Sequence, residues 1–110
     1  VDKVIFAGFV DKSKVMGYFS ASDIGVWPGN NSVSIIEAMA CGLPIVMANM
    51  QLGHLVSYGN GIKFPQHDEK KLREALEKLI NDKNARSKMM TIEIMNVKYF
   101  RPTLNSKQYL

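Results

Sequence analysis

The sequence contains a single cysteine, Cys41, among its 110 residues. One cysteine excludes a disulfide framework and a zinc site built from cysteines, and it favours a reducing, intracellular compartment. No apolar stretch approaches the ~20 residues that a membrane-spanning helix needs. The chain begins Val1-Asp2-Lys3, with neither an initiator methionine nor a signal-peptide pattern. We therefore expect a cytoplasmic, globular piece of a longer protein.

Strong charge is also missing. The formal net charge is only +4, and no cluster of lysine and arginine alternates with aromatic residues, which argues against nucleic acid as a partner. The modest positive charge fits an anionic ligand or a peripheral membrane contact. Neither His54 nor His67 has a carboxylate or cysteine at metal-ligand spacing, so we expect no metal site.

What the sequence does contain is an alternation of short apolar runs with segments of helical length. We expect strands at Val4–Gly8, Asp23–Pro28, Pro44–Ala48 and Ile62–Phe64. Helices are expected between them, from Asp11 or Ser13 to Ser20–Ser22, over Val33–Cys41 and over Leu52–Tyr58. Strands joined by helical connections run parallel, so the sequence predicts an α/β fold: a parallel sheet with helices on both faces.

The last third of the chain predicts two helices. Asp68 can cap the first, whose apolar residues recur at helical spacing: Leu72, Ala75, Leu76, Leu79 and Ile80. Asn81–Asn84 separates it from the second, whose inward residues are expected to be Ala85, Met89, Ile92 and Met95 or Asn96. Pro102 is expected to end regular helix. We place one domain at 1–98 and a tail at 99–110, with Phe100 and Tyr109 as aromatic anchors.

A side-chain-poor loop lies between the second expected strand and its helix. It reads Gly29-Asn30-Asn31-Ser32, and Ser32 is a plausible helix cap. Gly42 followed by Pro44 ends the helix. Unpaired amides at a helix start attract phosphate, and Glu37 lies about one turn deeper. The layout indicates a nucleotide site.

The string Ile36–Val46 (IEAMACGLPIV) resembles the "lEAMAcGxPVv" signature of the C-terminal domain of GT-B glycosyltransferases of family 4, the group 1 transferases. Further similarities cover about residues 4 to 90. Gly8-Phe9-Val10 is similar to the family's "G-x-V", Tyr18–Ile24 to its "yy-x-x-aDi" and Gly59–Ile62 to its "G-x-nG-l". The helix Asp68–Ile80 is similar to the family's "d-x-x-x-l-x-x-al-x-x-ll".

The resemblance implies a retaining transfer of a sugar from a nucleotide-sugar to an acceptor. It implies no metal and no cofactor, because the nucleotide-sugar is itself a substrate. Two Rossmann-like domains would face each other across a cleft, with the donor on the C-terminal one. The N-terminal acceptor domain is absent from this chain, and any peripheral contact with the inner face of a membrane would pass through it. Synthesis of a polysaccharide or glycolipid is the expected role.

The resemblance also implies a role for each donor-binding residue. Glu37 would accept hydrogen bonds from the ribose hydroxyls. Backbone amides at Ser32, Val33 and Ser34 would meet the diphosphate. The base would lie against Gly8, Phe9 and Val10. Sugar or phosphate contacts would come from the loop: Gly29, Asn30 and Asn31. No catalytic residue is assigned.

Plainer interpretations of these residues stay open. Glu37 can be a surface residue, Ser32 a cap and Phe9 part of the core. Relatives carry a second glutamate eight residues before the one that matches Glu37, and Gly29 stands there instead. A non-catalytic, degenerate α/β module for nucleotide binding or protein interaction is therefore the alternative function. A GT-B epimerase is a weaker third hypothesis.

Overall fold

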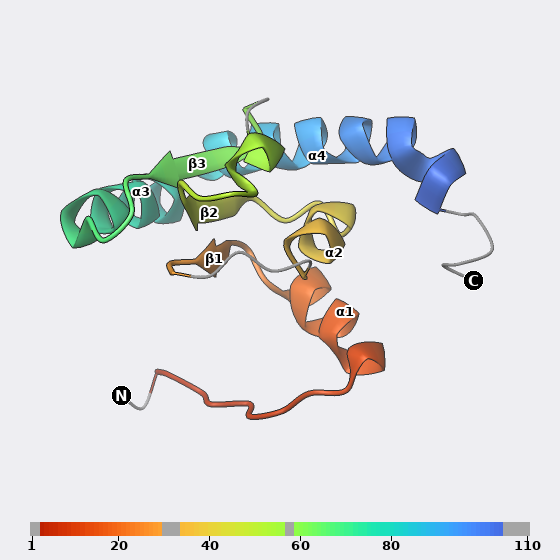
Figure 1. Cartoon of the computed structure of the whole chain (residues 1–110), viewed down its shortest axis with the longest axis horizontal. Coiled ribbons are helices and arrows are strands. Elements are labelled where there is room, and N and C mark those ends of the chain that lie inside the picture. Colours follow the sequence, from red (N-terminus) through yellow and green to blue (C-terminus); the bar gives the residue numbers. More distant parts are fainter. Residues whose placement is uncertain (1–2, 30–33, 57–58, 105–110) are drawn as a thin grey trace.

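A computed structural model of the chain describes residues 3–29, 34–56 and 59–104, with side chains described as far as residue 93. Helices and strands alternate as far as the third strand, and two helices follow (Figure 1). In chain order the elements are α1 (Lys12–Ala21), β1 (Gly25–Trp27), α2 (Ser34–Ala40), β2 (Ile45–Ala48), the 3-10 helix η1 (Gly53–Val56), β3 (Gly61–Phe64), α3 (Glu69–Asn81) and α4 (Lys83–Leu104).

The three strands form one parallel sheet in the order β1-β2-β3. Residue 45 pairs with residue 25 on one side and with residue 61 on the other, and the register continues along both edges of β2. Each strand is joined to the next through a helix, as parallel pairing requires. The predicted α/β, Rossmann-like fold class is confirmed.

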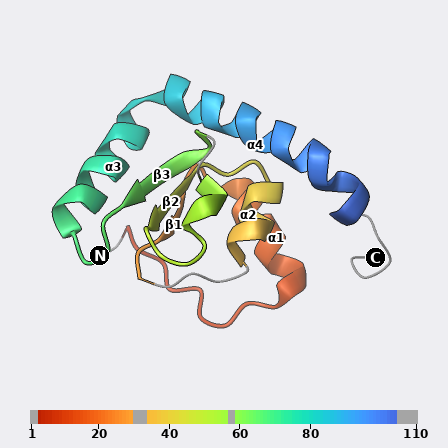
Figure 2. The ribbon, with the colours of Figure 1, turned by 45° about the horizontal axis from the view of Figure 1, so that its top comes forward.

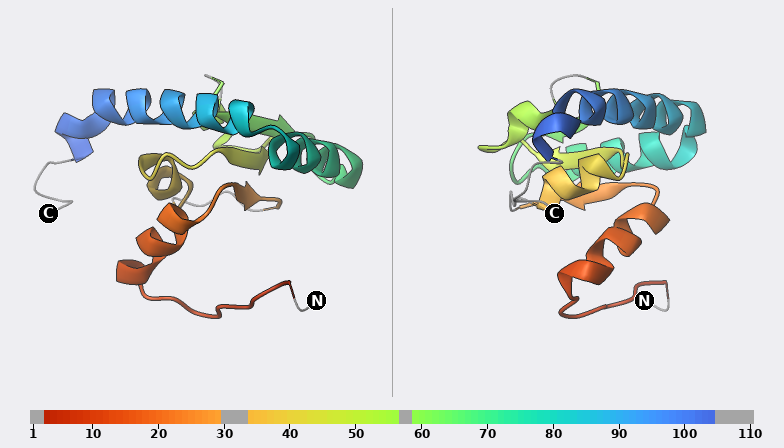
Figure 3. Two further views of the ribbon diagram at one scale, coloured as in Figure 1. Left: turned by 180° about the vertical axis from the view of Figure 1, so that it is seen from behind. Right: turned by 90° about the vertical axis from the view of Figure 1, so that its right-hand side faces the viewer.

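The core lies on both faces of β2, whose four side chains are fully buried. Ile45 and Met47 pack on one face with Ile35 and Ala38 of α2. The alternate residues of β2, Val46 and Ala48, pack on the other face with α3 and the start of α4. The predicted cover of helices on both faces is confirmed, and Figures 2 and 3 show the two helical layers around the sheet. A strand buried on both faces explains why PIVMA is apolar throughout.

Helix ends follow the expected cap residues. The Asp68 carboxylate accepts a hydrogen bond from the Lys71 amide at 3.0 Å and caps α3. Gly42, at a φ of 77°, ends α2. Leu43 N–H donates to Ala38 C=O at 3.2 Å beside it, as in a Schellman motif. Asp11 precedes α1 as expected, but its side chain makes no capping bond.

The expected strand at Val4–Gly8 is wrong. These residues form no strand, and Ile5 and Phe6 are 89% and 88% exposed. An apolar run becomes a strand only where a neighbouring strand supplies hydrogen bonds. In the described part of the chain β1 is an edge strand, and this segment runs apart from it (Figures 1 and 3).

Two expectations about helices need correction. The helix expected over Leu52–Tyr58 is the single 3-10 turn η1, and residues 57–58 lie outside the described part. Ile80 does not face inward, because it is 61% exposed. At 100° per residue it lies about 80° around the helix from Leu72, at the margin of the buried stripe.

The expectation that Pro102 ends regular helix is also wrong, because α4 continues to Leu104. Near a helix end the missing N–H of proline removes only one intrahelical bond, so the last turn can continue. α4 therefore crosses the boundary that we placed after residue 98, although the division into domain and tail stays a prediction. Residues 105–110 of the tail, including the expected anchor Tyr109, fall outside the described residues. None of the described helices is both long enough and apolar enough to cross a membrane.

Substituting Gly61 tests the close contact between β2 and β3. A Cβ atom there would collide with the Ile45 carbonyl oxygen and lie 3.0 Å from its carbon, so backbone must move. We expect Gly61→Ala to lower the free energy of unfolding by about 2–3 kcal/mol in urea titrations. Gly17→Ala is the control, because open space surrounds that position on α1. It should raise stability by about 0.5–1 kcal/mol, and an equal loss in both variants would contradict the account.

Candidate functional site

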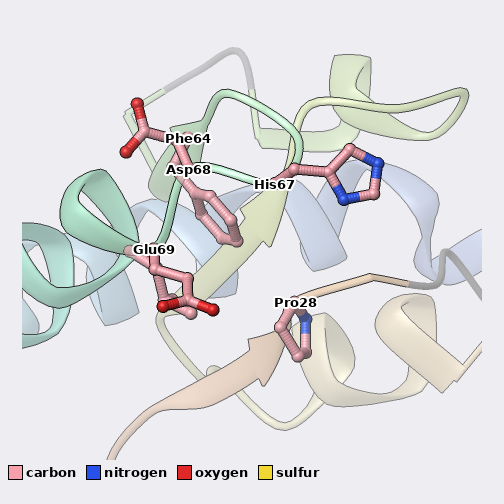
Figure 4. A pocket seen from close by; sticks show the side chains of 6 residues that line it. Pro28, Phe64, His67, Asp68 and Glu69 are labelled. Carbon is pink, nitrogen blue, oxygen red and sulfur yellow. The ribbon is translucent and has the colours of Figure 1, made fainter.

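The carboxyl ends of the three parallel strands meet at one edge of the sheet, and a hollow of about 360 Å³ opens there (Figure 4). Pro28 follows β1 and Phe64 ends β3, so two non-adjacent strands contribute to its wall. The start of α3 and the turn before it supply the remaining lining residues: His67, Asp68, Glu69 and Leu72. Ligands of open α/β sheets bind at this edge.

The hollow is acidic. Asp68 Oδ1 is occupied in capping α3. The Glu69 side chain reaches toward the Pro28 side of the hollow (Figure 4). His67 is exposed and has a φ of 68°. The Glu69 carboxylate repels phosphate but accepts hydrogen bonds from hydroxyl groups, so this side of the hollow suits an uncharged, hydroxylated ligand group.

A hydrogen bond closes the base of the predicted donor loop. Trp27 Nε1–H, at the end of β1, donates to Ser34 Oγ at the start of α2 over 3.2 Å. The Trp27 ring also packs on Phe19 of α1, with ring centroids 6.2 Å apart. Gly29 is exposed, with open space where a Cβ would lie. The predicted loop residues 30–33, including Asn30, Asn31, Ser32 and Val33, lie outside the described residues.

Glu37 lies on the first turn of α2, as the sequence predicts. Its side chain is half-buried, whereas the neighbouring Ala38 is fully buried and Ile36 is 42% exposed. Glu37 thus stands at the border between the α2 core face and solvent. A carboxylate in that position can still be reached by a ligand, and its donor-binding role stays a prediction.

The structure does not bring Gly8, Phe9 and Val10 to the strand ends. Phe9 is 97% exposed, so its interpretation as a core residue is wrong. Together with Val10 it lines a second hollow of about 220 Å³, beside Asp11, Lys14 and Tyr18 of the α1 region. Figures 1 and 3 show the segment running apart from the sheet. The segment predicted to contact the base therefore lies apart from the strand ends, and its donor-binding role stays a prediction.

Metal chemistry finds no support among the described residues, which hold no group of three histidine, cysteine or acidic side chains that could bind an ion. Cys41 is half-buried, and its Sγ lies 4.0 Å from the Met16 carbonyl oxygen. His54 on η1 is exposed. The half-buried position of Cys41 is that of a small packing residue.

A buried polar pair at the opposite end of the sheet was not predicted. Asn60, before β3, and Glu93, on α4, are both fully buried. Asn60 Nδ2–H donates to Glu93 Oε1 at 2.7 Å and to the Leu55 carbonyl at 2.8 Å. Burial raises the pKa of Glu93 from 4.5 to about 7, and the Asn60 hydrogen bond opposes that rise. Spacing could have indicated Glu93, because it continues the inward stripe of Ala85 and Met89 by one more turn.

A parallel sheet with helices on both faces and a polar hollow at its strand ends defines the class of Rossmann-like α/β proteins. A family model described as glycosyl transferases group 1 matches residues 1–82. The chain therefore belongs to the group 1 glycosyltransferases. Neither the curated proteins nor the solved structures contained a match.

A double-mutant cycle on Trp27 and Ser34 tests the bond that closes the loop base. Trp27→Phe keeps an aromatic ring against Phe19 but removes the indole donor, and Ser34→Ala removes the acceptor. We expect a coupling free energy of about 0.5–1.5 kcal/mol from urea unfolding of the wild type, both single variants and the double variant. If the stability losses of the two single variants simply add in the double variant, the hydrogen bond between Trp27 and Ser34 is contradicted.

Proposed function

We propose that this chain is the donor-binding part of a retaining glycosyltransferase that moves a sugar from a nucleotide-sugar to an acceptor in polysaccharide or glycolipid synthesis. The observation that carries the proposal is the family match over residues 1–82, which includes the whole Ile36–Val46 string. That string folds as a compact unit in which α2 ends at Gly42 and β2 begins at Ile45. The family's motif thus spans most of α2 and the first two buried residues of β2.

Within this proposal the nucleotide diphosphate binds at the loop that leads into α2. Amides of Ser32, Val33 and Ser34 hold the phosphates, and the Glu37 carboxylate accepts hydrogen bonds from the ribose hydroxyls. The bond from Trp27 to Ser34 supports the assignment, because it ties the end of β1 to the start of α2. A fixed base lets a short polar loop present its amides at low entropic cost.

The acidic hollow suits the sugar rather than the phosphates. Gly29 offers no carboxylate to the sugar, but the neighbouring Pro28 lines the same hollow as Glu69. We place the sugar hydroxyls there, with Glu69 as their acceptor. Carboxylates commonly bind sugar hydroxyls, and both oxygens can accept at once. The base contacts proposed for Gly8, Phe9 and Val10 require the segment before α1 to move toward the strand ends.

One observation favours a second function, a non-catalytic module that has lost sugar transfer. Gly29 stands where the resemblance implies a sugar-binding glutamate, and glycine cannot replace a carboxylate. In its interaction form such a module would keep the fold and bind no nucleotide. Binding measurements separate the two functions.

Titration of the 110-residue chain with uridine, guanosine and adenosine diphosphates tests the diphosphate site by amide NMR. We expect at least one nucleotide, near 1 mM, to shift the resonances of Ser32, Val33 and Ser34, because their amides hold the phosphates. Glu37→Ala should weaken binding about 10–100-fold, since the ribose loses two hydrogen bonds to a charged group.

Glu77→Ala, an exposed acidic position on α3, is the matched control and should bind as the wild type does. A flat titration with all three nucleotides would favour the non-catalytic module. Equal losses in both variants would contradict a specific contact at Glu37, because removing a negative charge should by itself strengthen binding of an anionic nucleotide.

Glu69→Gln tests the sugar assignment separately. We expect this variant to bind a nucleoside diphosphate as well as the wild type does, because it leaves the loop before α2 unchanged. Its affinity for the matching nucleotide-sugar should fall about 5–10-fold, since an amide replaces an acceptor carboxylate. Isothermal titration calorimetry of both ligands measures the difference. Unchanged affinity for the nucleotide-sugar would show that the hollow is not part of the donor site.

A further inference from the structure

The buried pair of Asn60 and Glu93 leaves two acceptors without donors. Both hydrogens of the Asn60 amide are used, one by Leu55 C=O and one by Glu93 Oε1. Leu55 C=O can only accept, which fixes the amide orientation. Asn60 Oδ1 and Glu93 Oε2 are buried and have no hydrogen-bond partner among the described residues. Orphaned acceptors in a fully buried pair need a physical explanation.

A single proton on Glu93 would give both buried oxygens a hydrogen bond. An ionised Glu93 would place a negative charge away from water, with one hydrogen bond from Asn60 to stabilise it. A proton on Oε2 abolishes the charge and creates a donor. If that donor meets Asn60 Oδ1, the acid and the amide pair reciprocally, each donating to the other.

We propose that Glu93 is held as a neutral carboxylic acid whose Oε2–H donates to Asn60 Oδ1, so that the docking of α4 on the turn before β3 depends on this proton. The pair joins two segments that are far apart in sequence. Asn60 also holds η1 through Leu55, so the proton completes a network that connects η1, β3 and α4. This inference is independent of the donor site.

Among the residues whose side chains are described, no charged neighbour accounts for the protonation. The pKa of Glu93 is raised by burial alone, against the opposing effect of Asn60. Arg86, on the same helix, donates instead to the carbonyls of Leu79 and Ile80. The remaining described titratable groups on the elements around α4 contribute nothing to the rise: Glu37 and Cys41 at α2, His54 on η1, Lys63 on β3, the charged residues of α3, Asp82 before α4, and Lys83 and Lys88 on α4.

The sign of the pH effect follows from the direction of the pKa shift. Below pH 4.5 Glu93 is protonated in both the folded and the unfolded chain, and its contribution to stability is complete. Between pH 4.5 and about 7 only the folded chain keeps the proton, so rising pH favours unfolding by about 10-fold per unit. Above pH 7 the loss is complete, at about 300-fold in the unfolding equilibrium constant.

Urea unfolding of the 110-residue chain from pH 4.5 to 8.5 tests the proposal. Glu93→Gln has an amide that is uncharged at every pH and can still pair reciprocally with Asn60. Relative to the wild type it should be equally stable at pH 4.5 and at least 30-fold less unfolded at pH 8. Glu77→Gln is the matched control, because its exposed side chain should give a difference from wild type that does not change with pH.

Glu93→Met distinguishes the effect of removing the charge from the effect of the hydrogen bonds to Asn60. Methionine removes the charge but cannot bond to Asn60, so it should be at least 5-fold more unfolded than Glu93→Gln at pH 8. Equal stability of these two variants would overturn the reciprocal pair. A stability difference between Glu93→Gln and the wild type that does not change with pH, or that has the opposite sign, would contradict the protonation of Glu93 in the folded chain.

Carbon-13 NMR of the Glu93 side-chain carboxyl gives a readout on the unmutated chain. We expect its chemical shift to titrate near pH 7 in folded protein. A midpoint below pH 5 would overturn the proposal even if the variants fail to fold.

Discussion

The strand β2 buries both of its faces at once, and the rest of the fold is arranged to make that burial complete. All four of its side chains are excluded from water, two against α2 and two against the layer of α3 and α4. Each large apolar side chain buried in this way contributes roughly 1.5–3 kcal/mol. Such burial requires a hydrogen-bonded strand on each edge, which β1 and β3 supply. The parallel pairing in turn brings the strand ends, and with them the hollow, to one edge.

Much of this fold could be predicted, because the elements that depend on local signals carry those signals in their own residues. Gly42 and Asp68 fix helix ends through backbone conformation and capping, which act within one turn. The segment Val4–Gly8 shows the limit of such reasoning. It is as apolar as β2, yet it forms no strand, because apolar composition records a preference for burial and not the presence of a neighbour. The predictions for Ile80 and Pro102 were wrong for a related reason. Ile80 lies at the edge of the buried stripe of its helix, and Pro102 lies near a helix end, so the usual rule applies to each only weakly.

The candidate site could likewise be predicted only in part from the sequence. The motif around Glu37 is contiguous, so the sequence indicated both the helix and the family. The hollow at Pro28 and Glu69 could not be seen, because its walls come from segments about forty residues apart that only the sheet order brings together. Glu93 was missed because only apolar residues were counted on its helix face. A buried acid satisfies the same periodicity at a high desolvation cost, and the partner that reduces this cost, Asn60, lies 33 residues away.

The central functional claim is that the end of β1 and the start of α2 hold a nucleotide whose ribose reaches Glu37. The most direct test is an X-ray difference map of crystals of this chain soaked in the nucleoside diphosphate that binds best in solution. We expect density for the diphosphate at the loop entering α2, with the ribose hydroxyls within hydrogen-bond distance of Glu37. Density elsewhere on the molecule, with that loop empty, would contradict it.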